Sequence, residues 1–273
     1  MIKVLWTLFA VTILLTIVDL FGLLLGFDLF NNDTFRLLFL THPVILLLLH
    51  ATYTKGIIRG LALIVLASFV GWFMETLGLK WGTVFGGIYS YGGNTSVIGI
   101  VPVPVVCYWG VFIYTGYSVV NSFYYWVGKQ LPNISRTNHL ILLLTIIADG
   151  LLVTFIDLFM DPIQVAQKAW AWLDGGPYFG VPIGNFIGWF VVTVIATGSF
   201  RIYEYLYPRS EKIDSNIHLI PVIGYGLLAL SFAISSIQLE LFSLLFIGLP
   251  LMVPVVVVNF MLYLRRGRGR IGE

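Results

Sequence analysis

Long, uninterrupted apolar stretches alternate with short polar ones along the whole chain. A helix that spans a membrane needs about 20 predominantly apolar residues. Because the stretches here are continuously apolar, whereas the strands of a membrane barrel alternate, helices are favoured over a barrel. We therefore predict an all-α, polytopic integral membrane protein with eight transmembrane helices. The predicted helices cover residues 4–26, 35–53, 57–79, 97–127, 138–160, 181–203, 217–236 and 241–264.

Prolines mark two of the predicted helices. Pro102 and Pro104 interrupt the first third of the fourth helix, and Pro250 and Pro254 lie within the eighth. A proline inside a helix removes a backbone hydrogen bond and crowds the preceding turn, so we predict a kink in the eighth helix. The first apolar stretch shows no small-residue cleavage site, and we interpret it as a membrane helix rather than a signal peptide.

The composition points the same way as the pattern. Of the 273 residues, 59% are hydrophobic and 10% are charged, whereas a soluble domain carries about 25% charged residues. No long polar stretch interrupts the apolar ones, so we predict a single membrane domain over residues 1–273. We expect a multi-pass protein of the cell membrane, surrounded by membrane lipid and without a nucleic-acid partner.

Lysine and arginine are distributed unevenly among the segments that connect the predicted helices. If the N-terminus is inside, 12 of the 15 lie on the cytoplasmic side, and only Arg36, Lys80 and Lys168 lie opposite. Since cytoplasmic loops carry an excess of these residues, we predict that both termini are cytoplasmic. The Arg-rich tail fits a topology anchor, with binding of anionic lipid as the alternative. The twelve residues are Lys3, Lys55, Arg59, Lys129, Arg136, Arg201, Arg209, Lys212, Arg265, Arg266, Arg268 and Arg270.

Two connections on the predicted outer side resemble each other. Residues 80–100 and 161–180 are both rich in glycine and aromatic residues. Each region contains a Gly-Gly pair, then a tyrosine, then Val-Pro, and a tryptophan seven residues after that proline. We interpret them as parts of a weak parallel repeat over residues 70–127 and 145–203, with chance similarity as the alternative. Repeats of this kind often meet at a binding site.

Carboxylates inside the apolar stretches are the main functional candidates, because a charge in a bilayer is costly. Glu75 and Asp157 lie near the outer ends of the third and fifth predicted helices. Asp161 follows Asp157 by four residues, on the same helix face, and Asp174 lies in the second outer connection. We expect these four to converge beneath the two outer connections. A carboxyl group in an apolar, like-charged setting tends to hold its proton, which is what an acid catalyst needs.

Several of these acids also fit a structural role. Asp161 precedes Pro162 and fits the N-cap of a short following helix. Asp174 precedes a Gly-Gly pair and fits a solvated turn. Asp149, in the middle of a predicted helix, fits either a buried hydrogen bond or a functional role, and Asp19 fits a contact between helices.

Neither a metal site nor another cofactor is expected. The single cysteine, Cys107, excludes an internal disulfide and a multi-cysteine metal site. His42, His50, His139 and His218 form no HxxxH or HxxE pattern. The sequence also contains no Gly-x-Ser-x-Gly elbow and no aspartate-rich diphosphate-binding motif.

Two groups of motifs lie between about residues 70 and 200. The first group is Trp72-Phe-Met-Glu-Thr-Leu-Gly, Phe85-Gly-Gly-x-Tyr-x-Tyr and Val101-Pro-Val-Pro. The second group is Asp157-x-x-x-Asp-Pro, Trp170-x-Trp, Gly176-Pro-Tyr-Phe-Gly-Val-Pro, Asn185 and Gly188-Trp-Phe. Together they resemble the carotenoid biosynthesis hydratase family, which includes the bisanhydrobacterioruberin hydratase of archaea and the bacterial carotenoid 1,2-hydratase.

The resemblance implies a hydro-lyase in the membrane. Such an enzyme adds water to the terminal isopropylidene double bond of an acyclic carotenoid, a lipophilic substrate. Association with other membrane enzymes of the carotenoid pathway is a further expectation from the resemblance.

The chemistry of hydration defines what the site must contain. Protonation of the alkene gives a tertiary cation, water attacks it, and a base takes the spare proton, all within a dry apolar slot. We expect Glu75 and Asp157 to be the acid and base, in either order, with Asp161 assisting. The residues expected to position water are Tyr89, Tyr91, Tyr178 and Asn185, and those expected to face the cation are Trp72, Trp109 and Trp189.

Three other functions fit parts of the pattern. A proton- or ion-coupled transporter also uses intramembrane carboxylates, although here they gather at one side without a basic partner opposite. A membrane lycopene cyclase also protonates an alkene, but an internal double bond captures the cation. A pigment-binding subunit without catalytic activity is the third alternative.

Overall fold

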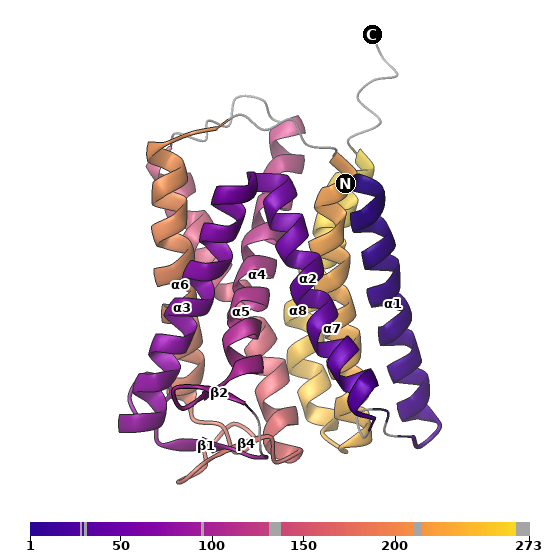
Figure 1. Ribbon diagram of the computed structural model, residues 1–273, viewed down its shortest axis with the longest axis vertical. Coiled ribbons are helices and arrows are strands. Elements are labelled where there is room, and N and C mark those ends of the chain that lie inside the picture. The colour runs from indigo at the N-terminus through magenta and orange to yellow at the C-terminus, as the bar shows by residue number, and fades with distance from the viewer. Residues whose placement is uncertain (28, 30–31, 94–95, 131–137, 210–214, 266–273) are drawn as a thin grey trace.

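The computed structural model describes residues 1–27, 29, 32–93, 96–130, 138–209 and 215–265. Across these residues, eight helices of 20 to 28 residues run side by side in one bundle (Figure 1). The helices are α1 (Ile2–Leu24), α2 (Asp33–Lys55), α3 (Ile57–Trp81), α4 (Val103–Gln130), α5 (His139–Ala166), α6 (Ile183–Leu206), α7 (Leu219–Gln238) and α8 (Phe242–Arg265).

All eight helices are long and apolar enough to cross a membrane, which confirms the predicted helix count and indicates a multi-pass membrane protein. Met1 and the end of α8 lie at the same end of the bundle, called here the terminal end (Figure 1). Five of the basic residues used to predict orientation lie outside the described residues, namely Arg136, Lys212, Arg266, Arg268 and Arg270. The orientation in a membrane therefore stays a prediction.

Short polar segments define where several helices begin and end. The side chain of Asn32 accepts a hydrogen bond from the Phe35 amide at the start of α2, and Asn138 does the same for Leu140 at the start of α5. Each asparagine satisfies one of the amides that a helix start leaves free. At the end of α3, Gly82 takes the left-handed conformation that an L residue adopts only at a cost.

Four short strands lie at the opposite end, called here the strand end (Figure 1). β1 (Tyr89–Tyr91) pairs antiparallel with β4 (Trp170–Trp172), and β2 (Val97–Ile98) pairs antiparallel with β3 (Val101–Pro102). The two glycine-rich connections are therefore joined by the β1–β4 ladder. The predicted start of the fourth helix at residue 97 is wrong, because residues 97–102 form β2 and β3 and α4 begins only at Val103.

Helix α5 extends further than predicted. Pro162 lies inside it, and the helix continues to Ala166 instead of stopping near residue 160. Proline cannot donate to the carbonyl four residues earlier, which is that of Leu158. The hydroxyl of Tyr178 donates to this carbonyl at 2.9 Å and replaces the missing bond. The interpretation of Asp161 as an N-cap is therefore wrong, since Asp161 lies within the helix.

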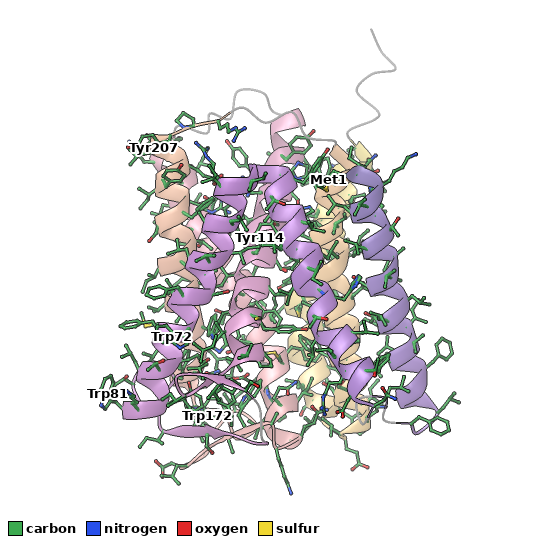
Figure 2. All side chains as sticks on the ribbon, viewed as in Figure 1. Met1, Trp72, Trp81, Tyr114, Trp172 and Tyr207 are labelled. Atoms are coloured by element: carbon green, nitrogen blue, oxygen red, sulfur yellow. The ribbon has the colours of Figure 1, made fainter. Side chains whose placement is uncertain are left out.

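Side chains divide the bundle into a packed interior and an apolar surface. Tyr114 lies deep between the helices, whereas Met1 and Tyr207 mark the terminal end and Trp81 and Trp172 mark the strand end (Figure 2). Large apolar side chains such as Phe246 and Ile58 are more than four-fifths exposed on the outside of the bundle. A surface of this kind suits lipid as the surrounding solvent.

Candidate active site

Glu75 of α3 is the acceptor at the centre of a set of aromatic donors. Its side chain is 4% exposed. One carboxylate oxygen, Oε2, accepts hydrogen bonds from the hydroxyls of Tyr89 and Tyr91, the latter at 2.7 Å. The other, Oε1, accepts from the indole N–H of Trp109 at 3.0 Å. Three donors offset part of the cost of removing water from a carboxylate.

The face of α3 that carries Glu75 is shaped by two glycines. Gly71 and Gly78 lie four residues before and three residues after it, on the same helix face. A Cβ atom on Gly71 would collide with the Trp109 ring, and one on Gly78 would approach the Tyr89 hydroxyl to 2.9 Å. The glycines therefore make the room in which Trp109 and Tyr89 reach the carboxylate.

The donors Tyr89 and Tyr91 are held by the ladder between β1 and β4. Tyr89 is paired with Trp172 in that ladder, and the Trp172 indole N–H donates to the Phe85 carbonyl at 3.0 Å. Burial first, and then the adjacent Glu75, raise the pKa of Tyr89 and Tyr91 well above the usual tyrosine value. Both hydroxyls therefore keep their protons and donate to Glu75.

The second group of acids lies on α5 and is bridged by Asn185 of α6. The Asn185 amide nitrogen Nδ2 donates to Asp157 Oδ2 at 2.8 Å and to Asp161 Oδ2 at 2.6 Å. The two carboxyls are 0% and 2% exposed. Their Oδ1 atoms have no hydrogen-bond partner among the described residues. Asn185 thus donates one hydrogen of its amide group to each of the two carboxyls.

The connection between α3 and β1 is fixed against α6 at close range. Val84 takes a backbone φ of 69°, which is strained for a β-branched residue. A Cβ on Gly188 of α6 would collide with the Val84 carbonyl, and one on Gly184 would approach the Cα of Gly86 to 2.7 Å. Glycine in α6 is therefore what allows this strained segment to lie beside Asn185.

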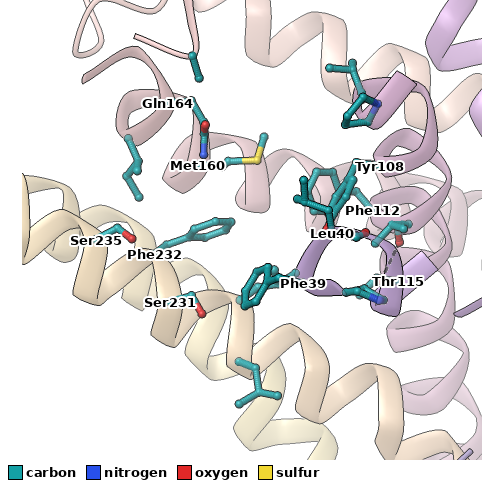
Figure 3. Close-up of a pocket in the computed structure, with 18 of the residues that line it drawn as sticks. Phe39, Leu40, Tyr108, Phe112, Thr115, Met160, Gln164, Ser231, Phe232 and Ser235 are labelled. Carbon is teal, nitrogen blue, oxygen red and sulfur yellow. Dashed lines mark hydrogen bonds between the residues drawn. The ribbon is translucent and has the colours of Figure 1, made fainter. Parts of the chain in front are cut away.

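Glu75 and Asp161 both face one large cavity of about 1080 Å³. This is at the upper end of the roughly 300–1,000 Å³ of ordinary small-molecule sites. Apolar and aromatic side chains dominate its middle, including Phe39, Tyr108, Phe112 and Phe232 (Figure 3). Trp109 and Trp189, with ring centroids 4.1 Å apart, form a stacked wall beside Glu75.

The structure brings most of the predicted site residues to this cavity. Those that line it are Glu75, Asp161, Tyr89, Tyr91, Trp109, Asn185 and Trp189. Asp157 lies behind Asp161 and does not line the cavity. Trp170 and Trp172, quoted only as part of a motif, line it as well. Among the other polar residues that line it are Gln164, Gln167, Ser231, Ser235 and Gln238. They could not be predicted as site residues, because serine and glutamine carry no distinctive signal in a sequence.

Three predicted residues lie elsewhere. Trp72 does not line the cavity, and its indole N–H donates to the Ile98 carbonyl, which holds the β2–β3 hairpin. Tyr178 does not line it either and is instead bound to the Leu158 carbonyl. Asp174 is exposed in the turn after β4, so the expectation that it joins the other acids is wrong and the solvated-turn interpretation is confirmed.

Asp149 belongs to a separate buried cluster. Arg201 of α6 donates to both of its oxygens, from Nε at 2.5 Å and from Nη2 at 2.7 Å. Glu204 accepts from the hydroxyl of Tyr117 and pairs with Lys55 at 2.9 Å. From the charge pattern, Arg201 was expected among the cytoplasmic flanking residues, but it is 7% exposed and lies within the bundle. Two carboxylates and two cations balance here, which supports a structural role.

Among the described residues, no group of three or more His, Cys, Asp and Glu side chains is placed to hold a metal ion. The fold and the site together define a multi-pass membrane protein with a buried carboxylate cluster at one end of a largely apolar cavity.

Comparison with known proteins identifies the family. A family model described as carotenoid biosynthesis protein matches residues 35–258. The chain therefore belongs to the carotenoid biosynthesis protein family, which confirms the resemblance inferred from the motifs and assigns the protein a role in carotenoid biosynthesis. A search of curated proteins and a search of solved structures found no match.

Proposed function

We propose that the protein is a carotenoid hydratase that adds water to the terminal isopropylidene double bond of an acyclic carotenoid. The observation that carries the proposal is the placement of Glu75 and Asp161 on one apolar cavity, in a chain of the carotenoid biosynthesis family. An isolated trisubstituted alkene is electron-rich, so its hydration begins with addition of a proton and not of a nucleophile. A buried carboxyl is a suitable general acid for this step.

The acid in this proposal is the Asp157–Asp161 pair. The two carboxyls share a single amide donor, and no Lys, Arg or His within the described part of the chain forms an ion pair with either of them. Two like charges this close cannot both persist, so the pair holds one proton. Asp161 faces the cavity and is the member that delivers the proton to the CH carbon of the double bond. The motifs had suggested Glu75 and Asp157 as acid and base with Asp161 assisting, but Asp161 is the aspartate that lines the cavity.

The base in this proposal is Glu75. Its three aromatic donors stabilise the charged form and none of them competes for its proton. Protonation of the alkene leaves a tertiary cation at the dimethyl carbon. The oxygen of a water molecule attacks this carbon, and Glu75 accepts the released proton. Glu75 then passes this proton to solvent, and solvent returns one proton to the aspartate pair. The net change is the addition of one water and the formation of a tertiary alcohol.

The aromatic wall beside Glu75 fits the cation intermediate. Trp109 and Trp189 both line the cavity beside Glu75, and an aromatic face attracts a cation by about 0.5–2 kcal/mol. The long apolar part of the cavity, lined by residues such as Phe112 and Phe232, offers the slot in which the polyene lies. The apolar side chains that line this part of the cavity also restrict water to the end at which the carboxylates lie.

The test is expression of the protein in a host that makes acyclic carotenes, followed by chromatography and mass analysis of the pigments. We expect a product that is heavier by one water for each end that reacts, and its loss in Glu75→Gln and Asp161→Asn. Asn259→Leu is the control, because Asn259 is also buried and, among the residues that the structure describes, its side chain bonds to the Val255 carbonyl of its own helix alone.

The outcomes separate the alternatives. A product of unchanged mass but altered chromatography would indicate cyclisation instead of hydration. Full hydration by both Glu75→Gln and Asp161→Asn would exclude the proposed acid–base pair. Unchanged pigments with the wild-type protein, present in the membrane at normal levels, would contradict the proposed reaction.

A further inference from the structure

The cavity has a polar seam between α5 and α7 that the proposed acid–base pair does not explain. Along α5 and its C-cap the polar positions follow one another at intervals of three residues, and on α7 at intervals of four and three, so that each set lies on one face. All of them line the cavity. The seam consists of Asp161 and Gln164 from α5, the C-cap residue Gln167, and Ser231, Ser235 and Gln238 from α7.

The side chains in the middle of the seam have no protein partner. Gln164, Ser231 and Ser235 are partly buried, and their side chains make no hydrogen bond to any residue that the structure describes. They extend from facing helices into the space between them (Figure 3). The adjacent Ser236 behaves differently, because it is fully buried and donates to the Phe232 carbonyl at 2.8 Å.

The two ends of the seam differ in exposure. Gln167 and Gln238 are exposed where α5 and α7 end, at the strand end of the bundle. Asp161, at the inner end, is 2% exposed and its Oδ1 atom has no partner among the described residues. The seam thus connects the surface of the bundle to an unpaired oxygen of the proposed acid.

Neutral polar groups in an apolar cavity cost free energy unless something hydrogen-bonds to them. A polyene has no hydrogen-bonding groups and gains nothing from hydroxyls or amides. Water, with two donors and two acceptors, satisfies all of them. Since the seam residues other than Asp161 are uncharged, they would hold water without concentrating ions.

We infer that the polar seam between α5 and α7 is the path by which water enters the cavity from the strand end and reaches Asp161. The inference rests on the proposed function, because hydration consumes one water for each double bond and also requires solvent to return a proton to the acid. The polyene and the water would then approach the carboxylates along different walls of one cavity.

The test is the reactivity of single cysteines in membranes that contain no carotenoid. In a Cys107→Ala background, Ser231→Cys and Ser235→Cys are treated with a charged, water-soluble methanethiosulfonate, and the modified protein is detected by mass. Leu230→Cys is the matched control, because Leu230 precedes Ser231 but is 47% exposed on the outer surface of the bundle. We expect modification of both serine positions and no modification of Leu230→Cys.

Each result decides the inference. Absence of modification at Ser235→Cys, in a protein that reacts after denaturation, would overturn it, and so would equal modification of Ser231→Cys and Leu230→Cys. The measurement uses no carotenoid, so it stands whether or not the proposed reaction is found. If both cysteines are modified but no hydrated product is found, the proposed function is contradicted and the aqueous path is still supported.

A second measurement connects the path to turnover. Ser235→Leu fills the seam with apolar volume, whereas Ser235→Ala leaves the space open. In the carotene-producing host we expect loss of the hydrated product with Ser235→Leu and retention of it with Ser235→Ala. Hydration by Ser235→Leu at the wild-type level would contradict a water path through this position.

Discussion

At the residue scale, the partners of a buried carboxylate decide what it can do. Glu75 and Asp149 are both buried in apolar helices, but Glu75 receives only neutral donors whereas Asp149 is paired with Arg201. From the sequence one can predict that a carboxylate at either position costs free energy in a membrane and therefore has a structural or functional role. It cannot predict their partners, because Trp109 lies 34 residues from Glu75 and Arg201 lies 52 residues from Asp149. Contacts at such separations depend on how the helices pack.

Tyr178 illustrates a residue whose role changes once its partner is known. Its hydroxyl replaces the hydrogen bond that Pro162 cannot make, and burial together with Asp157 raises its pKa to about 12, so it remains a donor at neutral pH. We expect Tyr178→Phe to lower stability by about 1 kcal/mol, the net value of one hydrogen bond. Hydration by the folded protein should be unchanged. Thermal unfolding in detergent and pigment analysis check the two parts, and lost hydration at unchanged stability would contradict this assignment.

Asp149 and Arg201 allow a sharper stability prediction. Asp149→Asn leaves a buried guanidinium without its counter-charge, and breaking a buried pair in this way costs about 3–5 kcal/mol. The double variant Asp149→Asn with Arg201→Gln removes both charges and should be more stable than Asp149→Asn alone. Unfolding temperatures of the wild type and the two variants measure this difference. Equal stability of Asp149→Asn and the wild type would show that the Asp149–Arg201 ion pair does not stabilise the fold.

At the element scale, the helices follow from the apolar pattern and their ends do not. The third predicted helix begins at the observed residue, but α5 runs past Pro162 and α4 begins six residues late. In both cases an interaction with residues outside the helix determines where the helix begins or ends. The Tyr178 hydroxyl allows α5 to continue, and the β2–β3 pairing competes with helix formation before α4. The β1–β4 ladder has the same origin, since its strands lie about 80 residues apart and no local pattern pairs them.

The glycines of α3 provide a test at this scale. We expect Gly78→Ala to displace Tyr89, because the added Cβ would lie 2.9 Å from its hydroxyl and 2.7 Å from the Phe85 ring. Overpacking of this kind costs about 1–3 kcal/mol. Hydration should fall together with stability, since Tyr89 is a donor to Glu75.

The control for this substitution lies on the next helix. Gly128→Ala in α4 meets no atom within 4 Å, and alanine is favoured over glycine in a helix, so stability should stay the same or rise slightly. The two variants are compared by thermal unfolding and by pigment analysis. Equal behaviour of Gly78→Ala and Gly128→Ala would contradict the close packing of α3 against Tyr89.

At the scale of the whole molecule, eight helices place both ends of the described chain at one end of the bundle and the carboxylates toward the other. The count was predictable because each apolar stretch is long enough on its own. The cavity was not, because its walls come from six or more helices and its polar seam from two helices far apart in the chain. The direction in which the bundle crosses a membrane is predicted from the charge distribution alone, and it would decide from which side water reaches the site by the proposed path.

The charge distribution predicts that the terminal end is cytoplasmic and the strand end is external. Single cysteines test this in whole cells with a thiol reagent that does not cross membranes, in a Cys107→Ala background. Asp174→Cys reports on the strand end and Tyr207→Cys on the terminal end, since both positions are exposed. We expect Asp174→Cys to react in intact cells and Tyr207→Cys to react only after the cells are opened. The reverse pattern would invert the orientation and would place the entrance of the polar seam in the cytoplasm. Reaction of both positions in intact cells would contradict a bundle that separates two compartments.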